Sequence, residues 1–153
     1  MDEHDCVMGY LDSELRRYGG VVTTAEMYRE GHTQSILFWS VRYGSILRVR
    51  RGIYCDPKLP ADAVRALRVG GRLACVSALA HHGVIAAPDL LHVSVQGSAS
   101  RLRDPDTGRR GGSPDQTVIH WSRKRVAGDR IAVSVEEARR QAASCRSLAR
   151  DTL

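Results

Sequence analysis

The spacing of apolar residues near the start of the chain predicts a helix. Val7, Leu11 and Leu15 recur every four residues, which indicates a helix over residues 6–18 with one buried face. A pair of glycines ends this pattern, and the short apolar run Val21–Val22 follows as a candidate strand. The chain is therefore expected to open with a helix and a short extended segment.

Two short helical patterns follow, separated by a glycine. Thr23 and Glu26 have the spacing of a capping box at the start of the first helix. Gly31 is suited to end that helix, because glycine adopts the left-handed geometry of a C-terminal cap. Thr33 is the expected N-cap of the second helix, over residues 34–43.

The second of these helices has two different faces. Leu37 and Val41 are four residues apart and form an inner face, with Ile36 and Ser40 beside them. The opposite face combines polar, aromatic and basic side chains, namely Gln34, Ser35, Phe38, Trp39 and Arg42. Adjacent aromatic residues are unusual on a solvated face. They indicate either a recognition surface or side chains that pack beneath the next element as ordinary core.

A basic hairpin is predicted directly after this helix. Apolar and arginine residues alternate up to a two-residue turn, Arg51–Gly52, and Ile53–Tyr54 then returns. Arginines at such a position contact phosphates or enter the minor groove, or they protect a solvated edge strand. Two short helices followed by a basic hairpin predict a winged helix-turn-helix, whose second helix contacts bases in the major groove.

The rest of the chain predicts a second, smaller domain. Five segments carry regular patterns: helices over 62–69 and 73–82, strands over 91–96 and 117–122, and a helix capped by Ser134 that runs from Val135 to about Ala149. The expected fold class is α+β, with a winged helix-turn-helix at residues 1–58 and a small mixed α/β domain at residues 59–153. We expect the second domain to serve dimerisation, partner binding or additional DNA contacts.

Composition narrows the class of partner and the compartment. The 153 residues carry 23 basic and 17 acidic side chains and a net charge of +6, which favours a polyanionic partner. No apolar run is long enough to span a membrane and the first residues are acidic, so we expect a cytoplasmic protein. The four cysteines are widely scattered without zinc-site spacing, and they indicate free thiols in a reducing compartment.

Few residues suggest catalysis or metal binding. His81 and His82 are adjacent and do not share a helix face, so a structural role is expected. Asp104 and Asp106 follow Gly97–Ser98 as in nucleotidyltransferase metal sites, but the spacing is too short, and an Asp-Pro turn is expected instead. Nuclease, phosphate-loop and zincin motifs are not visible. We therefore expect no catalysis by this chain, no cofactor and no metal.

The segment around the two short helices resembles the N-terminal domain of the AbiEi family, the antitoxins of type IV toxin–antitoxin systems. Three motifs carry the resemblance: GVVT-A at 20–25, T-x7-V-R-x-G at 33–44 and LRVRRGIY at 47–54. It covers residues 10–57 and continues loosely through ACVSALAHHGV at 74–84. The resemblance implies a winged-helix autorepressor. Many actinobacterial relatives continue into an endonuclease domain similar to very-short-patch-repair nucleases. Relatives tend to have arginines in place of Phe38 and Trp39, so a different DNA sequence or ligand is implied.

These observations predict a sequence-specific protein that binds double-stranded operator DNA as a transcriptional repressor or autoregulator. A cognate toxin or a second copy of the chain is a further expected partner. The candidate DNA contacts are Thr33, Gln34, Ser35, Phe38, Trp39, Arg42, Tyr43, Arg48, Arg50, Arg51, Arg123, Lys124 and Arg125. The last three are explained equally well as a solvated loop. Two alternatives remain: the targeting part of a nuclease or defence protein, and a winged helix used only for protein contacts.

Overall fold

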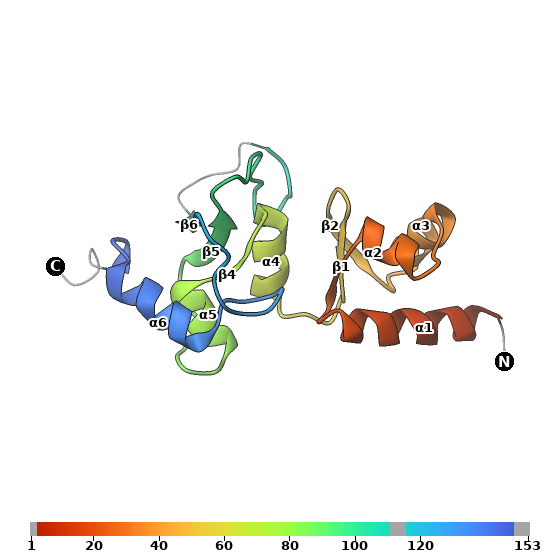
Figure 1. Ribbon diagram of the computed structural model, residues 1–153, viewed down its shortest axis with the longest axis horizontal. Helices are drawn as coiled ribbons and strands as arrows, with labels where there is room; N and C mark the ends of the chain where they lie inside the picture. Colours follow the sequence, from red (N-terminus) through yellow and green to blue (C-terminus); the bar gives the residue numbers. More distant parts are fainter. Residues whose placement is uncertain (1–2, 111–115, 149–153) are drawn as a thin grey trace. The chain divides into compact units, whose positions relative to one another are not determined.

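Both halves of the chain combine helices with a three-stranded sheet, so the protein is α+β. The computed structural model describes residues 3–110 and 116–148, and the chain divides after Pro60 into two units (Figure 1). The first unit contains α1 (Glu3–Arg17), β1 (Val21–Thr23), α2 (Thr24–Arg29), α3 (Gln34–Arg42), β2 (Leu47–Arg50) and β3 (Ile53–Cys55). The second contains α4 (Ala61–Val69), β4 (Arg72–Leu73), α5 (Cys75–His81), β5 (Leu91–Gln96), β6 (Thr117–Ser122) and α6 (Val135–Ser144). Within the described ranges, no helix combines the length and apolarity needed to cross a bilayer.

Local sequence signals set the helix ends in the first unit. The Thr23 hydroxyl accepts a hydrogen bond from the Glu26 amide, and the Glu26 carboxylate accepts one from the Thr23 amide, which confirms the predicted capping box. Thr33 caps α3 by accepting from the Ile36 amide. Gly31, between the two helices, has a φ of 93°, a left-handed conformation that glycine adopts without steric cost.

One hydrophobic core holds the three helices of the first unit to its sheet. Leu11 and Leu15, two of the three apolar residues predicted to form the buried face of the first helix, are confirmed in this core, and the side chain of the third, Val7, lies outside the described part of the structure. The buried members of the core are Leu11, Leu15, Val22, Met27, Leu37 and Ile46. A polar contact adds to the apolar ones. Glu14 lies on the buried face of α1 and its carboxylate contacts the His32 imidazole, in the turn between α2 and α3. The turn is therefore fixed to α1.

The sheet of the first unit is built on the predicted hairpin. Its strand order is β1-β3-β2, and all pairs are antiparallel. A bulge between Arg48 and Arg50 increases the local twist of β2 just before the turn. At the turn, Gly52 has a φ of 79°, and its carbonyl accepts a 3.0 Å hydrogen bond from the Thr24 amide. The tip of the hairpin is thereby joined to the start of α2.

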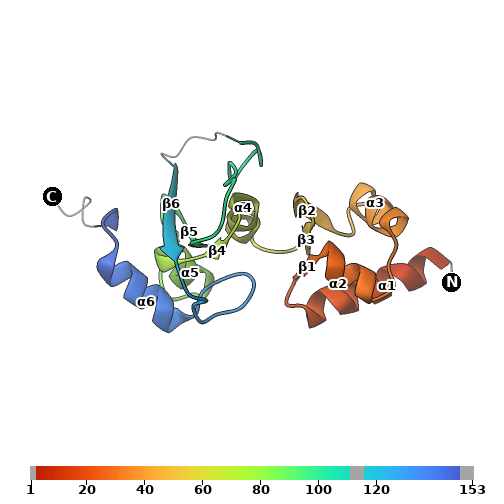
Figure 2. The ribbon, with the colours of Figure 1, turned by 45° about the horizontal axis from the view of Figure 1, so that its top comes forward.

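The second unit has a mixed sheet of strand order β4-β5-β6 (Figure 2). β4 is antiparallel and β6 is parallel to the central strand β5, and the strands predicted at 91–96 and 117–122 are confirmed. The first five residues of β5 are all buried, so both faces of the sheet are covered at this strand. α4 and α5 pack on β5, and α6 packs on α5.

Two predicted helix ranges need correction. The helix expected from Leu73 begins at Cys75, because Leu73 is buried as the second residue of β4. The last helix was predicted to reach about Ala149, but α6 ends at Ser144. Cys145 has an extended backbone with φ −76° and ψ 114°, which cannot continue the helix. Ala149 itself lies outside the described residues.

The predicted Asp-Pro turn is confirmed in the loop between β5 and β6. The Asp104 carboxylate accepts hydrogen bonds from the amides of Asp106 and Thr107, at 2.9 and 2.7 Å. Asp106 also accepts from the Arg65 guanidinium at 2.8 Å, which anchors this part of the loop to α4. Residues 111–115 of the same loop lie outside the described residues.

We expect Gly71→Ala to destabilise the second unit. A Cβ at residue 71 would lie 2.0 Å from the Ser94 carbonyl oxygen and 2.9 Å from a methyl carbon of Val93, so the backbone of β5 would have to shift. The free energy of unfolding of this unit should fall by about 3 kcal/mol or more. Trp121, the tryptophan of the second unit, reports this unfolding by fluorescence in urea when Trp39 is replaced by phenylalanine.

Gly108→Ala is the matched control, because it places the same methyl group in open space. Gly108 has a φ of 68° and nothing within 4 Å of a built Cβ, so only the left-handed backbone resists the substitution. That strain costs about 1–2 kcal/mol. Equal effects of the two substitutions would show that β4 and β5 do not approach as described.

Candidate functional site

The outward face of α3 is exposed. Phe38, Trp39 and Tyr43 are 60%, 48% and 65% exposed, so the alternative that the two adjacent aromatics pack beneath the hairpin is wrong. Leu37 and Ser40 form the buried face of the helix. The polar candidates on the same outward face are also exposed, namely Thr33, Gln34, Ser35 and Arg42. The helix therefore presents both apolar and hydrogen-bonding groups to solvent.

The three exposed rings form a continuous row along α3. Phe38 meets Trp39 edge to face, with ring centroids 5.2 Å apart. Trp39 in turn stacks on Tyr43, at 5.7 Å and an interplanar angle of 24°. We call Phe38, Trp39 and Tyr43 the aromatic row. Because each ring is held by its neighbour, the row is a pre-formed apolar surface rather than three independent side chains.

Positive charge accumulates on α3 and the hairpin without acidic neighbours in the sequence. The 25 residues from Gly31 to Cys55 include four arginines and no aspartate or glutamate. Arg42, Arg48 and Arg51 are exposed, and no carboxylate among the described residues forms an ion pair with them. Arg50 is half-buried. The charges of Arg42, Arg48 and Arg51 are therefore not neutralised by an ion pair within the described part of the chain.

The first unit holds α3 and the hairpin in a fixed relation. The Thr24–Gly52 hydrogen bond joins the hairpin tip to α2, and the Glu14–His32 contact joins the α2–α3 turn to α1. In Figures 1 and 2, α1 runs along one side of this unit, while α3 and the hairpin loop lie on the other. An exposed helix beside a basic hairpin is an arrangement that can approach a polyanion.

The remaining candidates, Arg123, Lys124 and Arg125, lie in the second unit. They follow β6 and are exposed. Lys124 and Arg125 line an open hollow of about 240 Å³ together with Arg72 and Arg130. These residues therefore form a basic surface of their own, on a different unit from the aromatic row.

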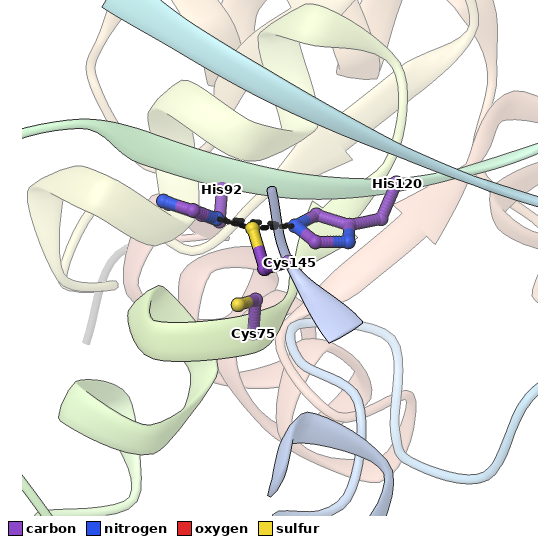
Figure 3. A group of neighbouring side chains, drawn as sticks. All are labelled: Cys75, His92, His120 and Cys145. Carbon is purple, nitrogen blue, oxygen red and sulfur yellow. Dashed lines mark hydrogen bonds between the residues drawn. The ribbon is translucent and has the colours of Figure 1, made fainter. Parts of the chain in front are cut away.

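The structure also brings together four side chains that no sequence motif connects. They are Cys75 at the start of α5, His92 on β5, His120 on β6 and Cys145 directly after α6, and we call them the Cys/His cluster (Figure 3). Their sulfur and nitrogen atoms all lie within 4.8 Å of one another. His92 Nδ1 is 3.1 Å from His120 Nε2, and Cys145 Sγ is 3.9 Å from each of these nitrogens.

Backbone register places the two histidines on one face of the sheet. His120 pairs with Ser94 in the parallel ladder, and Ser94 is two residues from His92, so both imidazoles project to the same side. The backbone of His92 is held by two hydrogen bonds of 2.9 Å, one from its amide to the Ser77 hydroxyl and one to its carbonyl from the Ala74 amide.

The two cysteines reach the cluster from the helices that cover this face. The Cys75 amide donates to the Gln141 side-chain oxygen at 2.9 Å, which ties the start of α5 to α6. Cys145 ends α6, and its sulfur lies 3.1 Å from the Ser147 hydroxyl. Four different elements therefore converge at one point.

Burial dominates the protonation behaviour of the cluster. It lowers the pKa of His92 to about 4, helped by the neighbouring His120, and it also lowers the pKa of His120. Burial raises the pKa of the Cys75 thiol to about 12. For Cys145, burial acts to raise the pKa, but hydrogen bonds from Ser147 and Leu148 outweigh it and the pKa is lowered. Both imidazoles are therefore neutral near pH 7.

No local sequence pattern indicates this cluster, because its members are far apart in the chain. His92 and His120 are separated by 28 residues, and Cys145 follows after another 25. Each histidine lies in a segment whose alternating pattern predicts a strand, LHVSVQ or TVIHWS. The sequence does not indicate the register between these two strands, and it is this register that brings the histidines together.

No protein-family model and no curated protein matches the chain. The resemblance to the AbiEi antitoxins therefore stays a prediction that rests on the motifs quoted for it.

The faces of α3 can be checked by stability measurements. Trp39→Ala should lower the free energy of unfolding of the first unit by about 1 kcal/mol or less, because its ring contacts Phe38 and Tyr43 on an exposed face and is not part of the core. Leu37→Ala should lower it by about 2–5 kcal/mol, because Leu37 is only 3% exposed within the core. Hydrogen exchange of the α1 and α3 amides measures both. A large loss of stability with Trp39→Ala would contradict the assignment of the outward face.

Proposed function

We propose that the first unit is a winged helix-turn-helix and that the protein is a sequence-specific, double-stranded DNA-binding regulator. It acts in the cytoplasm as a transcriptional repressor or autoregulator, by binding and without catalysis of its own. One observation carries the proposal. The nine-residue helix α3 exposes polar, basic and aromatic side chains beside a hairpin whose exposed arginines have no acidic partner among the described residues. Such a surface complements both the base edges and the phosphates of duplex DNA.

In this proposal, α3 enters the major groove. Arg42 is suited to donate two hydrogen bonds to a guanine, and Gln34 to make a bidentate contact with an adenine. The aromatic row supplies apolar contacts to thymine methyl groups. These contacts distinguish one base pair from another, so α3 determines which sequence is bound.

The hairpin has a different role in the same complex. Arg48 is exposed just before the bulge and Arg51 is exposed in the turn, where both are suited to contact phosphates of the adjacent backbone. Such contacts strengthen binding to every sequence and carry no base information. They also make the affinity fall steeply with salt, because each neutralised phosphate releases counterions.

A second function is favoured by the aromatic row itself. Three contiguous exposed rings on one helix are suited to bind another protein, such as a cognate toxin or a second copy of this chain. In that case α3 is a protein-docking helix, and the protein shows no preference among DNA sequences. The antitoxin role that the resemblance implies requires both activities, DNA binding by the first unit and neutralisation of a toxin.

Selection of duplexes from random sequence tests the proposal directly. The full-length protein should enrich a defined motif, and the symmetry of that motif gives the number of copies bound. Recovery of unrelated sequences, with binding no tighter than to bulk DNA, would eliminate sequence-specific regulation. Binding of a purified partner protein by the same α3 face would then support the second function.

Substitutions on α3 should alter specificity. We expect Arg42→Ala and Trp39→Ala to weaken binding to the selected site by about 1–3 kcal/mol for each lost base contact, and to relax the preference at one or two base pairs. Fluorescence anisotropy with single-base variants of the site measures this. Arg16→Ala is the control, because it removes one exposed positive charge from α1. A uniform loss across all base variants would show that α3 does not read sequence.

Substitutions on the hairpin should alter salt dependence. The double variant Arg48→Ala and Arg51→Ala should bind all duplexes more weakly and lower the slope of log affinity against log salt concentration by about two, one for each lost phosphate contact. Titrations at several salt concentrations measure the slope, with Arg16→Ala again as the control, which removes one exposed positive charge from α1. An unchanged slope would show that the hairpin does not touch the DNA backbone.

A further inference from the structure

We propose that the Cys/His cluster of Cys75, His92, His120 and Cys145 binds one Zn²⁺ ion, in a closed tetrahedral site that stabilises the second unit. The proposal does not depend on DNA binding by the first unit. It rests on the positions of the four donor atoms, on their chemical type and on the elements that they join.

The distances between the donor atoms match those around a tetrahedral zinc ion. Zinc bonds of about 2.0–2.1 Å to nitrogen and about 2.3 Å to sulfur place neighbouring ligand atoms roughly 3.3–3.8 Å apart. The two imidazole nitrogens are 3.1 Å apart, and Cys145 Sγ is 3.9 Å from each of them. With all four atoms within 4.8 Å of one another, shifts of about 1 Å or less would complete the tetrahedron.

The donor set identifies the metal and its role. Two cysteine sulfurs and two imidazole nitrogens form a combination typical of structural zinc sites. Four protein ligands leave no coordination position for water or substrate. Cys75 is 0% exposed and His92 is 1% exposed, so solvent does not reach the cluster from their side. The geometry points to a structural site rather than a catalytic one.

Two features around the cysteines support a bound ion. Cys75 has a φ of 50°, a left-handed conformation that is unfavourable for a non-glycine residue and persists only where the surrounding structure enforces it. The Ser147 hydroxyl lies 3.1 Å from Cys145 Sγ and can donate a hydrogen bond to it. Donors directed at a sulfur stabilise its thiolate, as partners of metal-bound cysteines do.

The ion would secure the elements that have the least apolar burial. In α6 only Glu137 and Ala138 are buried, and every residue of β6 is partly or fully exposed. Both elements contribute one ligand, whereas the other two ligands come from the well-buried α5 and β5. Zinc would therefore join the weakly packed elements to the packed ones, across 53 residues of chain between His92 and Cys145.

Metal content of the full-length protein gives the first test. The protein, purified in reducing buffer and reconstituted with Zn²⁺, should contain one zinc per chain after dialysis. Replacement by Co²⁺ should give the intense visible bands of tetrahedral coordination and a thiolate-to-cobalt charge-transfer band in the ultraviolet. Removal of the ion by a chelator should lower the unfolding temperature reported by Trp121 but not that reported by Trp39, and added Zn²⁺ should restore it.

Variants of the ligands give the second test. Cys145→Ser and His120→Asn should each weaken zinc binding at least tenfold in competition with a chelating dye. The matched controls Cys55→Ala and His81→Asn remove the same residue types outside the cluster and should leave the affinity unchanged.

Three results would overturn the proposal. The first is the absence of stoichiometric metal in the reconstituted, reduced protein. The second is a Cys75–Cys145 disulfide in the protein as isolated, detected by mass spectrometry. The third is unaltered zinc affinity in the ligand variants. If a variant does not fold, the Co²⁺ spectrum of the unsubstituted protein still tests metal binding. A cluster that holds only hydrogen bonds and binds no metal would not give the bands of tetrahedral Co²⁺.

Discussion

A nine-residue helix is not stable alone in water, so everything that α3 presents to solvent depends on what its other face buries. Leu37 enters the core between α1 and the hairpin, and Thr33 caps the first turn. These contacts determine the rotation of the helix about its own axis. Because that rotation is fixed, the aromatic row and Arg42 must face outward together. The exposed face of α3, a candidate recognition surface, is thus oriented by the side chains that the opposite face of the helix buries in the core.

The second unit concentrates its buried apolar residues at its centre. Its centre, formed by α4, α5 and β5, is well buried, but the elements on its margin are not. At that margin, hydrogen bonds hold the elements together. Gln141 binds the Cys75 amide, and Arg72 donates to the carbonyls of Val126 and Asp129 at 2.5 Å. A site that draws ligands from α5, β5, β6 and the end of α6 is a further means of holding such a margin.

The sequence was informative where structure is set locally. The capping box at Thr23, the N-cap at Thr33 and the strands at 91–96 and 117–122 depend on neighbouring residues, and they were predicted correctly. The error at Leu73 came from pairing between distant segments. Its local pattern predicts a helix, but its pairing with Val93 places it in β4. The Cys/His cluster depends on the parallel register of β5 and β6, which no local signal in either strand specifies.

The aromatic row, together with Arg42 and Arg51, which form no ion pair among the described residues, supports the proposal that the first unit binds DNA rather than a protein. A protein partner could cover the aromatic row, but it would also need acidic groups placed to match Arg42 on the helix and Arg51 at the hairpin tip. Duplex DNA supplies both kinds of complement in a regular arrangement, since thymine methyls line the major groove and phosphates border it. In DNA, one regular structure places the methyl groups for the rings beside the phosphates for the arginines. A protein partner would need a separate apolar surface and a separate acidic surface in the matching positions.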